Sequence, residues 1–213
     1  PSDIERRSNA MIKWFNARQK GVDRARSEIN GSKCKVYHAI ETNKVLDAMN
    51  GIPGIVNNVL PHVKSDMVSW SAYDGMRFDG NHDKGLELYK GLKYIESKHQ
   101  PAIGINKPQK VYIGELGVPE KVMLMRENTM TYNLDSYMGV CIALNVPYLV
   151  YWQLYCNEPH NNPNSPPSEV LSADQLNGYW LIKPDGNLSI AGQYYSSILN
   201  NAGGTISNQS VSQ

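Results

Sequence analysis

The stretch 111–117, Val-Tyr-Ile-Gly-Glu-Leu-Gly, constrains the fold of this chain more than any other. Val, Tyr and Ile favour a pleated strand, and the glycines on either side of Glu115 allow backbone or ligand to approach closely. The pattern predicts a short buried strand with Glu115 at its carboxyl end, where β/α proteins collect their catalytic groups. Taken alone, Glu115 fits a solvated acid in a strand-to-helix loop equally well.

Helix-like and strand-like apolar patterns alternate along the rest of the chain. Three more strands are expected, at 35–40, 66–71 and 147–152; the last is a nearly continuous apolar run, typical of a strand buried on both faces. Helices are expected at 9–29, 54–63, 82–99, 119–144 and 189–199. This alternation predicts an α/β fold with a parallel sheet and helical crossovers. The folded part is expected to cover 1–201, followed by a polar tail at 202–213.

Charge argues against several classes of partner. The 21 basic and 20 acidic residues are nearly balanced and form no block of like charge. A nucleic-acid footprint and a membrane-binding helix are therefore not expected, and no apolar run is long enough to span a bilayer. The five histidines have no metal-ligand spacing, so neither a catalytic metal nor another cofactor is expected: His38, His62, His82, His99 and His160.

Cysteines and sequons bear on the cellular compartment. The three cysteines are far apart, so they are buried or free thiols, or one disulfide with a thiol left over: Cys34, Cys141 and Cys156. Three Asn-x-Ser sequons favour a secreted or extracellular protein: Asn30, Asn187 and Asn208.

Four short motifs, in this order, resemble the second half of a clan A glycoside hydrolase. They are Ser-Ala-Tyr-Asp at 71–74, Gly-Glu-Leu-Gly at 114–117, Trp152 at the end of the last apolar run, and Tyr-Trp-Leu at 179–181 with Pro-Asp-Gly at 184–186 and Tyr-Tyr at 194–195. The resemblance implies an eight-stranded β/α barrel in which this chain supplies strands five to eight.

The resemblance also implies roles for individual residues. Glu115 matches the nucleophile of a retaining enzyme, Tyr73 an aromatic hydroxyl that aims it, and Trp152 a platform for a sugar ring. The acid/base glutamate of the family follows an asparagine at the end of strand four, and no Asn-Glu pair opens this chain. It would therefore lie upstream of Pro1.

Four parallel strands do not close a barrel. We therefore expect a partner, the N-terminal half of the same barrel, supplied by a separate fragment or by a second copy. An open four-stranded sheet is the alternative.

Other polar residues follow expected strands and are candidates for substrate binding. His38 and Glu41 are expected at the mouth of the first strand, and Asp74 follows the second. Without an outside acid, Glu41 or Asp74 is the proton donor within this chain. Asn157 is expected in a long loop with Glu158 and His160, where the three line the cleft or are simply solvated. The alternatives are a helix cap for Glu41, a rim aromatic for Tyr73 and a core residue for Trp152.

These observations favour a retaining O-glycosyl hydrolase that acts on a β-linked poly- or oligosaccharide. The alternative from another class is a non-catalytic carbohydrate-binding or structural protein on a degenerate barrel. A flavodoxin-like open sheet that binds a phosphorylated ligand is disfavoured, because no glycine-rich phosphate loop follows any strand.

Overall fold

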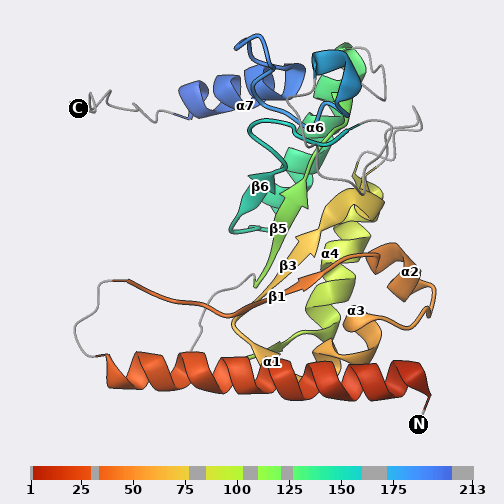
Figure 1. Ribbon diagram of the computed structural model, residues 1–213, viewed down its shortest axis with the longest axis vertical. Helices are drawn as coiled ribbons and strands as arrows, with labels where there is room; N and C mark the ends of the chain where they lie inside the picture. Colours follow the sequence, from red (N-terminus) through yellow and green to blue (C-terminus); the bar gives the residue numbers. More distant parts are fainter. Residues whose placement is uncertain are drawn as a thin grey trace. The chain divides into compact units, whose positions relative to one another are not determined.

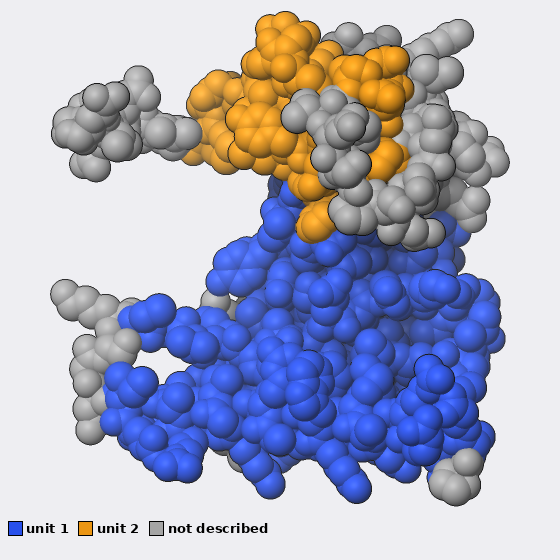
Figure 2. Space-filling view, viewed as in Figure 1, with its two compact units in different colours: residues 1–116, 135–151 blue, residues 117–134, 152–213 orange. Residues whose placement is uncertain are grey.

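The computed structural model describes residues 2–29, 34–76, 85–102, 110–120, 127–159 and 172–202. The chain forms two compact units, coloured separately in Figure 2. Unit 1 comprises 1–116 and 135–151, and unit 2 comprises 117–134 and 152–213. The two units are described one at a time.

Unit 1 is built on a parallel sheet of four strands (Figure 1). Its strands are β1 (Ala39–Thr42), β3 (Met67–Ser71), β5 (Val111–Leu116) and β6 (Leu149–Tyr151). The order across the sheet is β1-β3-β5-β6, and each neighbouring pair is parallel. Each strand of this sheet therefore lies beside the one that follows it along the chain. The predicted α/β class and parallel sheet are confirmed.

Helices and short turns connect these strands. In unit 1 they are α1 (Asp3–Glu28), α2 (Val45–Met49), α3 (Ile55–Asn58), α4 (Leu86–Lys98) and the 3-10 turns η1 (Leu60–His62) and η2 (Ala72–Gly75). Helix α6 (Glu127–Ala143) has residues in both units. A second small sheet pairs β2 (Lys64–Ser65) with β4 (Gln100–Pro101) in parallel.

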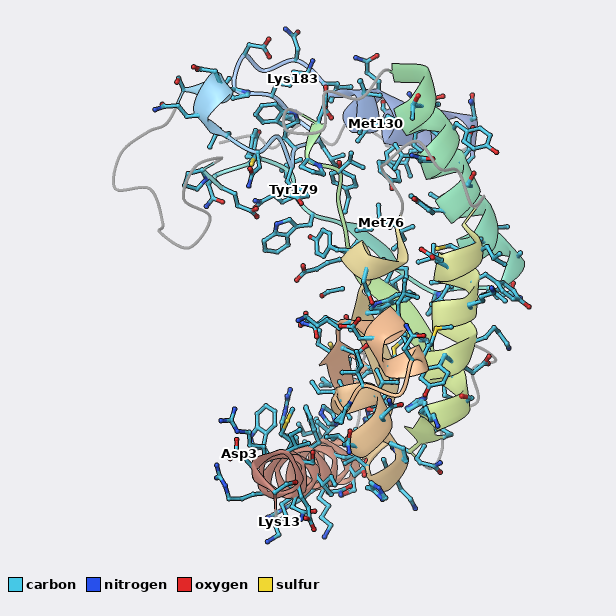
Figure 3. The ribbon with its side chains drawn as sticks, turned by 90° about the vertical axis from the view of Figure 1, so that its right-hand side faces the viewer. Asp3, Lys13, Met76, Met130, Tyr179 and Lys183 are labelled. Atoms are coloured by element: carbon cyan, nitrogen blue, oxygen red, sulfur yellow. The ribbon has the colours of Figure 1, made fainter. Side chains whose placement is uncertain are left out.

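One face of the four-stranded sheet is closed by helix packing. Five side chains point to this face by register and are fully buried; we call them the sealed face: Ile40, Val68, Trp70, Val111 and Ile113. Helix α4 runs along this side (Figure 3). The Trp70 ring lies against Gly75 of η2 and Gly91 of α4 so closely that a Cβ at either glycine would overlap it. Trp70 therefore fixes β3, the turn after it and α4 together.

A buried polar network fastens α1 to the amino-terminal ends of the strands. The Asp66 side chain, fully buried, forms an ion pair with Arg26 and accepts hydrogen bonds from Gln19 Nε2 at 3.1 Å and the His38 backbone N–H at 2.7 Å. Burial alone would raise the pKa of Asp66, but these donors, led by Arg26, hold it below its usual value. The charged form of Asp66 is thus part of the folded structure.

Two expected boundaries at the start of the chain were wrong. Helix α1 begins at Asp3, six residues before the expected start, because Ser2 caps it by accepting from the Glu5 N–H at 3.3 Å. Strand β1 begins at Ala39, which pairs with Met67, rather than at 35. His38 therefore precedes β1, so its expected place at the mouth of that strand was also wrong.

The expectation that 147–152 is buried on both faces was wrong as well. Strand β6 lies at one edge of the four described strands. Val150 is 50% exposed and Tyr148 just before the strand is 48% exposed. Both residues alternate with Leu149, which pairs with Ile113 of the sealed face, so they lie on the opposite side of the sheet, where the described residues leave them about half exposed.

Unit 2 contains the segment after β5 and the whole of the chain from Trp152 onward. Its further elements are the 3-10 turn η3 (Ala173–Gln175) and α7 (Ile190–Asn201), which confirms the expected final helix. Ser189 caps α7 by accepting from the Gly192 N–H at 3.0 Å, and its hydroxyl donates to the Trp180 carbonyl at 2.7 Å. The peptide bond between Trp152 and Gln153 is cis. The expected tail lies outside the described residues from 203 onward.

Two further observations concern the state of the cysteines and the membrane-spanning potential of the helices. Cys34, Cys141 and Cys156 are all free thiols, which agrees with the first of the two alternatives. Within the described segments, none of the helices has the length and apolarity needed to cross a membrane.

Two buried histidines predict acid sensitivity. Burial lowers the pKa of His38 and of His99, and the nearby Arg18 lowers that of His38 further. The unfolded chain therefore takes up protons below about pH 6.5 that the folded chain does not, so stability falls as pH drops below that value. Because the pKa of Asp66 is held low, a further loss follows at more acidic pH, as the pH falls through its folded pKa.

We expect the thermal midpoint, followed by circular dichroism, to fall between pH 7 and pH 5. His99→Gln should flatten this fall, since Gln keeps a donor near Ser65, whose hydroxyl and carbonyl oxygens both lie 3.0 Å from His99 Nε2. His62→Gln is the matched control, because His62 is exposed. A midpoint that stays constant over this range would contradict the assignment.

Candidate active site at the carboxyl ends of the strands

A β-bulge sets the direction of Glu115. Regular alternation would put Glu115 on the sealed face with Val111 and Ile113. Instead Ile113 pairs with Trp70 whereas Glu115 pairs with Ser71, so Gly114 is the extra residue of a bulge. Paired residues share a face, so Glu115 lies on the side of Ser71, opposite Trp70. Leu116 then returns to the buried side and is fully buried.

The side of the sheet that bears Glu115 is polar at its carboxyl end. By register it carries five residues that we call the polar face: Glu41, Ser69, Ser71, Tyr112 and Glu115. Gly114 lies against this face as well, since a Cβ there would overlap the Ser69 hydroxyl. The contrast with the apolar sealed face shows that the two sides of the sheet have different tasks.

Glu41 is a second carboxylate on the polar face, from the end of β1. The Ser71 hydroxyl donates to Glu41 Oε1 at 2.6 Å. Ser71 is also the register partner of Glu115, so this serine lies between the two acidic residues. The resemblance includes the segment 71–74 but gave Ser71 no role. The position of Ser71 at the end of an expected strand was the feature of the sequence that could have identified it.

Asp74 has a structural task in the fold. Its Oδ1 accepts from Trp70 Nε1 at 3.1 Å, and its Oδ2 accepts from the Leu46 N–H in the first turn of α2 at 2.9 Å. Asp74 therefore links the sealed-face tryptophan to a helix start, where a negative charge is stabilised. Substrate contact or proton donation by Asp74 stays a prediction that these bonds do not favour.

Tyr73 lies in η2, directly after β3. It is half-buried, and η2 packs against β5, the strand that carries Glu115. Tyr73 is thus close in the chain to Ser71, the register partner of Glu115. Its role in aiming Glu115 stays a prediction that this position supports.

The structure does not bring His38 to this cluster. His38 lies at the amino end of β1, buried, with Nδ1 3.1 Å from Gln19 Oε1 and its backbone N–H bonded to Asp66. Strand β1 separates His38 from Thr42, which ends the strand. Its neighbours belong to the network that holds α1, so the contacts of His38 are structural.

Two further candidates belong to unit 2. Trp152 is 38% exposed and donates its indole N–H to Glu158 Oε1 at 2.7 Å. Gln153 Nε2 donates to Asn157 Oδ1 at 3.4 Å and to Glu158 Oε1 at 3.3 Å, and Asn157 is exposed. An indole with a fixed edge and an exposed ring suits stacking on a sugar.

Tyr179, labelled in Figure 3, is half-buried, and its pKa is raised by burial and, to a lesser degree, by the nearby Glu158. His160 lies outside the described residues.

Gly114→Ala tests the bulge. The added methyl must displace the Ser69 hydroxyl and would still lie 3.2 Å from Ser69 Cβ, so we expect a loss of about 1–2 kcal/mol in the free energy of unfolding. Ser69→Ala in the same chain should recover part of that loss, because the overlapping oxygen is then gone. Denaturant unfolding of the two single variants and the double variant gives the coupling. Additive losses would show that Ser69 does not contact residue 114.

Comparisons with protein-family models, with curated proteins and with solved structures found no match in any of the three. The resemblance to clan A glycoside hydrolases therefore rests on four short motifs. The case for function rests on the geometry of the polar face, with its two carboxylates and the serine between them.

Proposed function

We propose that this chain is the C-terminal half of a β/α-barrel glycoside hydrolase of the retaining type, acting on a β-linked poly- or oligosaccharide with Glu115 as nucleophile. The observation that carries the proposal is the bulge at Gly114, which turns Glu115 away from the sealed face and onto the polar face. Bulges of this kind occur beside active sites, where they redirect a side chain. A solvated loop acid would need no such device.

Strand order supports the barrel. The order β1-β3-β5-β6 follows the chain without reversal among the four strands. Doubly wound sheets, including flavodoxin-like ones, reverse direction at a switch point, whereas barrel strands follow one another around a ring. The progressive order therefore favours half a barrel over the flavodoxin-like alternative.

The uncovered parts of the sheet support a partner. Parallel sheets normally have both faces covered, but here Glu41 and Val150 are exposed on the side opposite the sealed face. Strand β6 is also an edge strand whose residues, Leu-Val-Tyr, carry none of the charges that usually protect an edge. Both features are accounted for if the N-terminal half of the barrel, in a separate fragment or a second copy, pairs with these strands.

The chemistry needs two carboxyl groups. In a retaining glycosidase one attacks the anomeric carbon, and another, roughly 5 Å away, protonates the leaving oxygen and later deprotonates water. Glu115 supplies the attacking carboxylate, with Tyr73 near the same strand end to orient it. The acid/base belongs to the partner segment in this proposal. Within unit 2, the exposed ring of Trp152 is the candidate platform for a sugar ring.

Glu115→Gln tests the nucleophile. The amide does not form the glycosyl ester, so hydrolysis should fall at least about a thousandfold while the thermal midpoint changes little. The assay uses the native molecule, with any segment that co-purifies, on β-1,4-linked gluco- and manno-oligosaccharides. Its intact mass should reveal a companion chain of similar size or a second copy. Glu96→Gln, which removes an exposed carboxylate on α4, is the control.

A fluorinated substrate gives a sharper result. A 2-deoxy-2-fluoro β-glycoside with a good leaving group should leave its sugar esterified to Glu115, and peptide mass spectrometry would locate the adduct. Undiminished turnover in Glu115→Gln would remove this residue from the mechanism. Oligosaccharide binding with no turnover in the unmodified protein would favour the non-catalytic alternative.

A further inference from the structure

Glu41 combines a fixed position with free bonding capacity. Its Oε1 is held by the Ser71 hydroxyl at 2.6 Å, and the residue is exposed. Among the described residues no second hydrogen bond or ion pair reaches Glu41. One carboxylate oxygen is therefore oriented by the protein, and the carboxylate keeps acceptor sites that no described residue uses.

The bond from Ser71 fixes the direction of the Glu41 side chain. The Ser71 hydroxyl donates to Oε1, so the structure uses this carboxylate as a hydrogen-bond acceptor and leaves further acceptor sites on it. Glu41 is thus oriented to accept hydrogen bonds. Sugar hydroxyls are donors of the required kind, and a pre-oriented carboxylate binds them without first being ordered.

The charge of the four strands limits which sugars fit. Their residues include two carboxylates, Glu41 and Glu115, and no lysine or arginine. Both carboxylates lie on the polar face, with Ser71 between them. A sugar that carries its own carboxylate would meet like charge there with no strand residue to compensate it. A neutral sugar would meet no such repulsion.

We propose that Glu41, positioned by Ser71, is a specificity-determining residue that binds a hydroxyl of a neutral sugar and disfavours uronic acids. This inference rests on the proposed function, since it places the sugar on the polar face beside Glu115. It assigns Glu41 to substrate recognition and leaves the acid/base role to another group.

Two matched pairs of hexamers test the charge selectivity. They are β-1,4-linked glucohexaose with its glucuronate hexamer, and β-1,4-linked mannohexaose with its mannuronate hexamer. Calorimetric titrations use the full molecule with the single substitution Glu115→Gln, so that Glu41 is the remaining acid of the four strands. We expect at least one neutral hexamer to bind and its uronate counterpart to bind at least tenfold more weakly at low ionic strength. Equal or tighter uronate binding, or no binding of either neutral hexamer, would overturn the proposal.

Four variants in the same background, one of them a control, locate the effect. Glu41→Gln should weaken the neutral hexamer about tenfold and abolish the discrimination against its uronate form. Ser71→Ala should weaken binding about threefold, and Ser71→Thr, which keeps the hydroxyl, should restore it. Glu96→Gln should change neither quantity. Discrimination that persists in Glu41→Gln, or a Ser71→Thr variant as weak as Ser71→Ala, would show that the contact has no role in recognition.

This inference and the proposed hydrolysis can be contradicted separately, because one is tested by binding and the other by turnover. Selective, Glu41-dependent binding in a protein that hydrolyses none of the four hexamers would overturn the proposed hydrolysis and leave this inference intact. If hydrolysis depends on Glu115 but the protein binds neutral and uronate hexamers with equal affinity, this inference is overturned and the proposed hydrolysis stands.

Discussion

The packing of Trp70 is the interaction on which the rest of unit 1 depends. Its ring occupies the space that side chains at Gly75 and Gly91 would need, and its indole N–H bonds to Asp74, which also holds the start of α2. These contacts fix the carboxyl end of β3 on the sealed side. Ser71, the next residue, is thereby held on the polar side, where it meets Glu41 and pairs with Glu115. Burial on one face thus positions the two carboxylates on the other.

Periodicity and propensity predicted the strands at 67–71 and 111–116 well. Each of these strands pairs with a strand on both sides, so its apolar residues are buried as the pattern indicates. The start of β1 was missed because pairing with Met67 begins only at Ala39, whatever the propensity of the preceding residues. Helix α1 carried a readable start in Ser2 with Asp3 and Glu5, but its apolar period becomes visible only from Met11.

The candidate site was predictable in its residues and less so in its geometry. The glycines around Glu115 were visible, yet simple alternation places Glu115 on the buried side, and only the register with Ser71 reveals the bulge. Glu41 and Asp74 look alike in sequence, as acids near strand ends. Contacts separate them: both Asp74 oxygens accept hydrogen bonds within the fold, whereas only Oε1 of Glu41 has a bond to a described residue.

The composition of β6 carries a consequence for how this chain must be kept in solution. An uncharged strand that no described strand pairs with on one side is a template on which any extended segment adds by backbone hydrogen bonds, another copy of β6 included. In the function proposed above, the partner that completes the sheet also protects it against self-association. Under that proposal, an excess of this part over its partner would be prone to aggregate, which gives a cell reason to make both together.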